Sequence, residues 1–150
     1  TSGFRLRGLR ALGRLAPAER ALVLRAFLLV GVIRVALWVV PFRRVRQFMH
    51  ACERVPLSIP PDLPVSRLVW AVRSASRRIP MASCLTQSLA LQFLLLRAGR
   101  SSQLHIGVKK DPQTGFQAHA WVESEGLTLL STSSDVVDYS QLLALEDLSP

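Results

Sequence analysis

Cysteine is scarce in this chain, and its scarcity excludes two common ways of stabilising a small protein. The 150 residues contain two cysteines, Cys52 and Cys84, in different segments of the sequence. They form neither a CxxC pair nor another spacing typical of a zinc site, so we expect no structural metal and no other cofactor. So few cysteines are typical of a reducing cytoplasm and not of a secreted disulfide scaffold, so we expect a cytoplasmic protein with free thiols.

Acidic side chains are also few. The chain has 10 Asp and Glu against 19 Lys and Arg, which gives a formal net charge of +9 at pH 7. This balance predicts an acidic partner, which on charge alone could be nucleic acid, an anionic membrane surface, or an acidic peptide or protein. The sequence contains no helix-turn-helix, zinc-finger or basic-aromatic motif, so we expect that the partner is not nucleic acid.

The longest apolar run lies near the start of the sequence. Residues 21–40 are almost entirely apolar apart from Arg25 and Arg34, and a helix is predicted from about Pro17 to the residue before Pro41. Such a run could span a bilayer, but each arginine would cost roughly 2.5–3.5 kcal/mol at the membrane centre. We therefore predict a helix that is buried or docked on a surface, with peripheral membrane contact as the alternative.

A proline-rich connector divides the chain. Residues 56–64 contain four prolines, which favours an extended segment. We predict one domain over residues 1–150, because a chain of this length can bury its own core. Its parts are an N-terminal helical part at residues 1–55, the connector at residues 56–64, and a catalytic core at residues 65–150.

The periodicity of the sequence changes from helical to alternating after Gly99. Helices are predicted at Phe42–Cys52, Ser66–Arg78 and Cys84–Ala98, where apolar residues recur every three or four positions. Strands are predicted at residues 104–109, 116–123 and 127–131, separated by turn-forming segments at 110–115 and 125–126. From Thr132 onward we predict a loop and then a weak helix around residues 139–146. This order of elements predicts an α+β fold.

The helix predicted over Cys84–Ala98 carries a cysteine in its first turn. Ser83 is a good N-cap and Pro80 keeps the helix from starting much earlier, so Cys84 lies beside unpaired backbone N–H groups. The positive end of a helix favours a thiolate, which is the form that attacks a carbonyl carbon. Because a lone cysteine there is more often a small buried hydrophobe, its assignment as a nucleophile depends on a base elsewhere.

His119 is the predicted base. It lies in the middle of the strand at residues 116–123, on the same face as Trp121, whose ring could shield an ion pair from water. A cysteine and a histidine placed in this way perform acyl transfer, because the imidazole takes the thiol proton and later protonates the leaving amine. His105 on the neighbouring strand is the competing base, but we interpret it as a half-exposed strand residue.

A third group would orient the imidazole. The length of the turn before the last predicted strand determines which residue lies opposite His119. A two-residue turn places His119 opposite Thr132, and a three-residue loop places it opposite Ser131. Neither is a carboxylate, and the nearest acids beyond them are Asp135 and Asp138. We favour Asp135 as the third catalytic residue, since a bent loop could deliver it to the imidazole.

Several stretches of the sequence resemble a known family. They are Cys84–Gln92, Gly107–Lys110 and Gly115–Glu123, and more weakly residues 15–20 and 41–44. Together they are similar to the transglutaminase-like leader peptidases of lasso peptide biosynthesis. The resemblance implies a papain/transglutaminase-like core, in which a cysteine-bearing helix packs on a small antiparallel sheet. Cys84 and His119 match the family's nucleophile and base, whereas Ser131 stands near the position of the family's aspartate, which leaves Asp135 as the substitute.

The resemblance also implies an activity and its partners. The activity is that of a cytoplasmic cysteine peptidase that removes the leader from a ribosomally made precursor peptide, so that a separate ATP-using lasso cyclase can close the macrolactam. A separate small leader-binding recognition protein would present the precursor, and the basic, apolar N-terminal part would be a docking surface for that protein or for the leader.

Two alternatives to peptidase activity stay open. One is acyl transfer to an amine, which would use the same thioester intermediate with a different acceptor. The other is a non-catalytic protein of the same fold that holds the precursor or the cyclase. The absence of a carboxylate directly opposite His119 motivates this second alternative.

Overall fold

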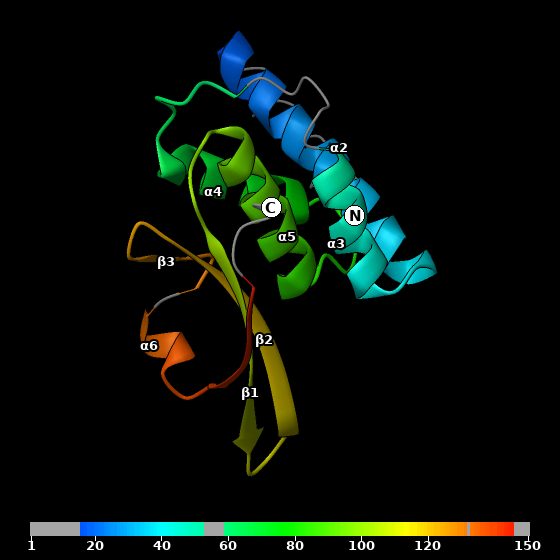
Figure 1. Ribbon diagram of the computed structural model, residues 1–150, viewed down its shortest axis with the longest axis vertical. Helices are drawn as coiled ribbons and strands as arrows, with labels where there is room; N and C mark the ends of the chain where they lie inside the picture. The colour runs from blue at the N-terminus through cyan, green and yellow to red at the C-terminus, as the bar shows by residue number, and fades with distance from the viewer. Residues whose placement is uncertain (1–15, 53–58, 132, 146–150) are drawn as a thin grey trace, which may run out of the picture.

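The computed structural model describes residues 16–52, 59–131 and 133–145. In this part of the chain, helices precede an antiparallel sheet of four strands, and a short helix lies before the last strand (Figure 1). The helices are α2 (Pro17–Val39), α3 (Phe42–Ala51), α4 (Val65–Ser76), α5 (Cys84–Arg97) and α6 (Ser133–Val136). The strands are β1 (Gln103–Asp111), β2 (Gly115–Ser124), β3 (Leu127–Leu129) and β4 (Ser140–Leu145), in the sheet order β3-β2-β1-β4. The predicted α+β fold, with a cysteine-bearing helix on a small antiparallel sheet, is confirmed.

Helix α5 is the central helix, and local contacts fix both of its ends. At its start, Ser83 Oγ accepts a hydrogen bond from the Thr86 backbone N–H at 3.3 Å, which confirms the predicted N-cap. At its end, Gly99 has a φ of +72° and the Arg100 N–H donates to the Leu95 carbonyl at 2.9 Å. This is the Schellman pattern, which only a residue that tolerates left-handed φ completes easily. The position of the first helical residue is therefore well determined.

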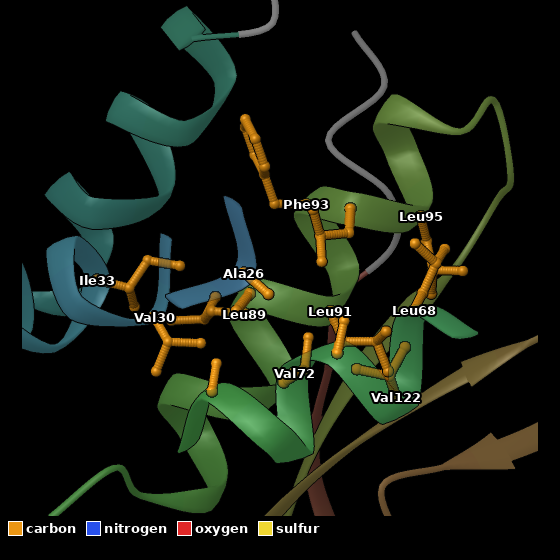
Figure 2. Close-up of a cluster of buried hydrophobic side chains, with 14 of the residues drawn as sticks. Ala26, Val30, Ile33, Leu68, Val72, Leu89, Leu91, Phe93, Leu95 and Val122 are labelled. Carbon is orange, nitrogen blue, oxygen red and sulfur yellow. The ribbon is translucent and has the colours of Figure 1, made fainter. Parts of the chain in front are cut away.

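The hydrophobic core lies between α5, the helices α2 and α4, and the sheet. Figure 2 shows side chains from all of these elements meeting in one cluster. Its fully buried members include Ala26, Val30, Leu68, Val72, Leu89, Leu91 and Val122. Burial of a Val or Leu side chain contributes about 1.5–3 kcal/mol to folding, so the N-terminal helices contribute to the stability of the sheet. The division into one domain with a connector at residues 56–64 stays a prediction, and residues 53–58 lie outside the described part.

Strands β2 and β3 meet in a two-residue hairpin. Ser124 pairs with Leu127, and the turn residues Glu125 and Gly126 have φ of +52° and +77°. Left-handed φ at both central residues is typical of the type I′ hairpin turn, so the predicted turn at residues 125–126 is confirmed, and of the two loop lengths considered the structure has the two-residue one. The strand itself is shorter than predicted, because Leu130 has a φ of +67° and turns the chain away from the ladder.

The last strand corrects a prediction. Residues 140–145 form β4, and not the weak helix that we predicted around residues 139–146. The strand pairs antiparallel with β1, with Ser140 opposite Val108 and Leu145 opposite Leu104. Leucine and alanine suit a helix locally, but the edge of β1 offers unpaired backbone groups that only the tertiary structure reveals.

Candidate active site

Cys84 is the first residue of α5, and it lies beside the strand that carries His119. It is half-buried, and its thiol, like that of Cys52, is free, as predicted. One helical turn further on, about 5.4 Å along the axis, the buried Ser88 Oγ donates a hydrogen bond to the Ala120 carbonyl at 3.1 Å. Since Ala120 follows His119 directly, this bond holds the first turns of α5 against the His119 segment of β2.

His119 is held by one polar contact and two aromatic contacts. Its Nε2 lies 3.0 Å from Ser131 Oγ, within hydrogen-bond distance. The Trp121 ring stacks on it at a centroid distance of 6.1 Å and an interplanar angle of 18°, as the shared strand face predicted. The Tyr139 ring lies 5.5 Å away, a contact that no sequence pattern predicted. Because Nε2 faces Ser131, Nδ1 is the ring nitrogen that remains to face a thiol.

Ser131 reaches the imidazole because the chain leaves the sheet early. An unbroken ladder from the two-residue turn would place Thr132 opposite His119. The ladder instead ends at Leu129, and the left-handed Leu130 redirects the chain so that Ser131 Oγ meets Nε2. The structure therefore has the two-residue turn, but the residue that meets the imidazole is Ser131, which we expected only for a three-residue loop.

A cavity of about 530 Å³ opens beside His119 and Ser131. Its lining includes both basic and acidic side chains. The lining residues are Arg73, Lys109, His119, Leu130, Ser131, Asp135, Asp138 and Tyr139. Asp135, which we favoured as the third catalytic residue, and Asp138, the next acid along the chain, thus lie in the same cavity as the imidazole. Arg73 reaches it from α4, which no sequence pattern predicted. Cys84 is not among the lining residues.

The electrostatic surroundings of His119 favour its neutral form. Burial lowers the pKa of His119 below its ordinary value of 6.5. The negative charge of Asp135 opposes this effect and raises the pKa, whereas the positive charge of Lys109 lowers it. A neutral imidazole at pH 7 is the form that can accept a thiol proton.

His105 supports Trp121 and does not line the cavity. It is only 5% exposed, so our interpretation of it as a half-exposed residue was wrong. Its ring stacks on Trp121 at 5.4 Å and 11°, which explains the burial. Its Nε2 lies 3.4 Å from Glu123 Oε2, while the Trp121 Nε1–H donates to Glu123 Oε1 at 3.2 Å. His105 and Glu123 therefore fix the ring that stacks on His119.

Gly107 provides the space that these aromatic rings occupy. It pairs with His119 across β1 and β2. A Cβ at Gly107 would lie 3.0 Å from Tyr139 Cβ and 3.1 Å from the Trp121 ring carbons Cη2 and Cζ3. These distances are shorter than carbon atoms normally approach, so glycine is required here by close packing.

The fold and this arrangement place the chain in the papain/transglutaminase-like class of α+β proteins. Residues 27–144, well over half of the chain, match the family described as Transglutaminase-like superfamily, and the chain belongs to this superfamily. The superfamily generally includes cysteine peptidases and acyl transferases. No curated protein and no solved structure matches the chain. In the part of the chain that the structure describes, no group of three His, Cys, Asp or Glu side chains could hold a metal ion.

Proposed function

We propose that this protein is a cysteine peptidase that removes the leader from a ribosomally made lasso precursor peptide before macrolactam closure. The observation that carries the proposal is the Ser88–Ala120 hydrogen bond, which holds the Cys84 end of α5 against the strand of His119. The contact of His119 Nε2 with Ser131 supports it further, because that contact orients the imidazole. The sequence resemblance supplies the substrate class.

The chemistry proceeds through a thioester. Neutral His119 takes the proton of the Cys84 thiol, and the thiolate attacks the carbonyl carbon of the scissile peptide bond. The backbone N–H of Cys84, at the first position of α5, stabilises the oxyanion of the tetrahedral intermediate. His119 then donates its proton to the leaving amine, the C–N bond breaks, and water hydrolyses the thioester with His119 again acting as the base.

The role of the third catalytic residue is divided between two side chains. Ser131 supplies a neutral hydroxyl that orients the imidazole through Nε2. Asp135 supplies the negative charge that stabilises the protonated imidazole, as its effect on the His119 pKa indicates. We therefore keep Asp135 in the catalytic set and add Ser131 as a positioning residue.

The proposed reaction defines the partners and the location. The substrate is the precursor, presented through its leader by a separate leader-binding recognition protein, and the product passes to the lasso cyclase. We place the reaction in the cytoplasm, where a ribosomally made peptide is synthesised. The mixed charges of Arg73, Lys109, Asp135 and Asp138 give the cavity polar groups that can bind a peptide backbone and its side chains.

The test is cleavage of the precursor in the presence of the leader-binding protein, followed by mass spectrometry. Cys84→Ala is expected to abolish cleavage, and His119→Ala to slow it by about 100- to 10,000-fold, the usual contribution of a general base. Asp135→Asn and Ser131→Ala are expected to have smaller effects, of about tenfold each. Ser131→Asp restores a carboxylate at the His119 contact and is expected to retain activity.

Three outcomes would reject the proposal. Cleavage that survives Cys84→Ala, or no cleavage by the wild-type protein with a competent partner, favours a non-catalytic protein that holds the precursor or the cyclase. Release of an amine-linked product in place of a free carboxylate indicates acyl transfer to an amine. Asp138→Asn is the matched control for Asp135→Asn, because both acids line the cavity and only Asp135 changes the His119 pKa.

A further inference from the structure

Helix α2 has an exposed apolar stripe that the peptidase chemistry does not use. We call it the outer α2 face, and its large side chains are Leu24, Phe27, Leu28, Val32, Val35, Trp38 and Val39. They recur every three or four positions, so at about 100° per residue they share one side of the helix over roughly 22 Å of its length. Their exposure is high, with Val35 at 62%, Trp38 at 79% and Val39 at 75%.

The opposite side of α2 is part of the core, which limits how the helix can meet a membrane. Pro17–Val39 is long and apolar enough to cross a bilayer, but 28% of its most apolar window is buried inside the protein. Ala26 and Val30 are fully buried against the rest of the core, as Figure 2 shows. A spanning orientation would pull α2 away from α4 and α5 and would also bury Arg25 and Arg34 in hydrocarbon. The outer α2 face is therefore suited to lie on a surface and not to cross it.

The charged side chains of α2 and α3 are almost all positive. Residues 16–52 contain six arginines and a single acid, Glu19. Glu19 Oε1 is bound to Arg67 of α4 at 2.6 Å, so its charge is already compensated within the protein. At the other end of α2, the Arg34 guanidinium lies 5.6 Å above the Trp38 ring, and exposed arginines follow at the start of α3.

We propose that the outer α2 face binds the surface of a bilayer that contains anionic phospholipid, with the helix lying parallel to the membrane plane. The apolar stripe would enter the boundary between headgroups and acyl chains, and Arg34, Arg43 and Arg44 would contact lipid phosphates. A tryptophan beside arginines is typical of side chains at that boundary. A single helix presents a ridge, which a fluid bilayer accommodates readily.

The orientation keeps the candidate active site accessible. Figure 1 shows α2 along the edge of the molecule farthest from the β1–β2 hairpin, with α4 and α5 between α2 and the sheet. The cavity beside His119 is lined by residues of β1, β2 and the segment around α6, and by Arg73 of α4. A protein bound through α2 would therefore present the cavity to the aqueous phase, and membrane binding requires none of the catalytic residues.

The first experiment is flotation of the purified protein with vesicles of phosphatidylcholine alone or mixed with phosphatidylglycerol. We expect binding to the mixed vesicles that weakens at high salt, because screening reduces the attraction of arginine for phosphate. Leu28→Glu and Val35→Glu, at exposed positions, are expected to weaken binding about tenfold or more. Phe116→Glu is the matched control, because Phe116 is 79% exposed on the β1–β2 hairpin, and it is expected to bind like the wild type.

The second experiment reports the position of the helix directly. Trp38 emission is expected to shift to shorter wavelength with the mixed vesicles, and a Trp38→Phe protein is expected to lose this shift while its other tryptophans still emit. Absence of binding to the mixed vesicles, or equal binding by the wild type and Val35→Glu, would overturn the proposal. Two results would instead assign the outer α2 face to a protein and would also overturn the proposal. One is a wild-type dimer that Leu28→Glu dissociates. The other is a wild type that binds the leader-binding protein but no vesicles, with Leu28→Glu losing the protein binding.

Discussion

The Gly107→Ala substitution tests whether close packing of aromatic rings positions the imidazole. The new Cβ would lie 3.0 Å from Tyr139 Cβ and 3.1 Å from two ring carbons of Trp121. Carbon atoms prefer separations of about 3.5–4.0 Å, so each contact is too short by about 0.5 Å and both rings must move. Overpacking of this kind costs about 1–3 kcal/mol, and each kcal/mol lowers the Tm of a chain of this size by about 2–4 °C. Because both rings contact His119, the rate of Cys84 alkylation should fall as well.

The assay is thermal unfolding followed by circular dichroism, together with the alkylation rate. Gly31→Ala is the matched control, because a Cβ there would meet only Ile79 Cδ1 at an ordinary 3.9 Å. Since Gly31 lies in the middle of α2, alanine is expected to stabilise the protein by about 0.5–1 kcal/mol. A Gly107→Ala protein that melts at or above the wild-type Tm, with unchanged alkylation, would show that this packing does not position the imidazole.

Two further predictions concern the same site. NMR titration of protein with blocked thiols should give His119 a pKa below 6.5. Asp135→Asn should lower this pKa further and Lys109→Gln should raise it, because each variant removes one of the two opposing charges. Shifts of the opposite sign would contradict this assignment. Ser88→Ala should lower the free energy of unfolding by about 1 kcal/mol, since it removes the hydrogen bond to the Ala120 carbonyl. It should also slow alkylation of the Cys84 thiol. Denaturant unfolding and alkylation kinetics that match the wild type would show that this bond does not position α5.

Much of the fold could be predicted because local sequence signals agree with the tertiary structure. The boundaries of α5 follow from the Ser83 cap and the Gly99 stop, and both signals act within one turn of the helix. The β2–β3 hairpin follows from the Glu125–Gly126 turn in the same way. These predictions required no knowledge of distant residues.

The predictions that failed depend on contacts between distant parts of the chain. β4 forms because β1 has an open edge, which outweighs the local helical preference of its leucines. The Ser131 contact depends on the left-handed backbone conformation of Leu130, which leucine rarely adopts and which no sequence pattern predicts. The entry of Arg73 and Tyr139 into the cavity depends on the docking of α4 and of the segment after α6. The alternation of β1 placed His105 on the correct face, but its burial depends on the stacked Trp121.

The pairing of Cys84 with His119 is tested most simply by the alkylation rate of Cys84 at pH 6, resolved from that of Cys52 by peptide mapping. Both thiols are free and half-buried, so Cys52 serves as an internal reference in the same molecule. We expect Cys84 to react with iodoacetamide faster than Cys52 and faster than free cysteine, and His119→Ala to remove the difference. A Cys84 that reacts no faster than free cysteine, or whose rate is unchanged in His119→Ala, would contradict the pairing of these two residues and favour a non-catalytic binding protein.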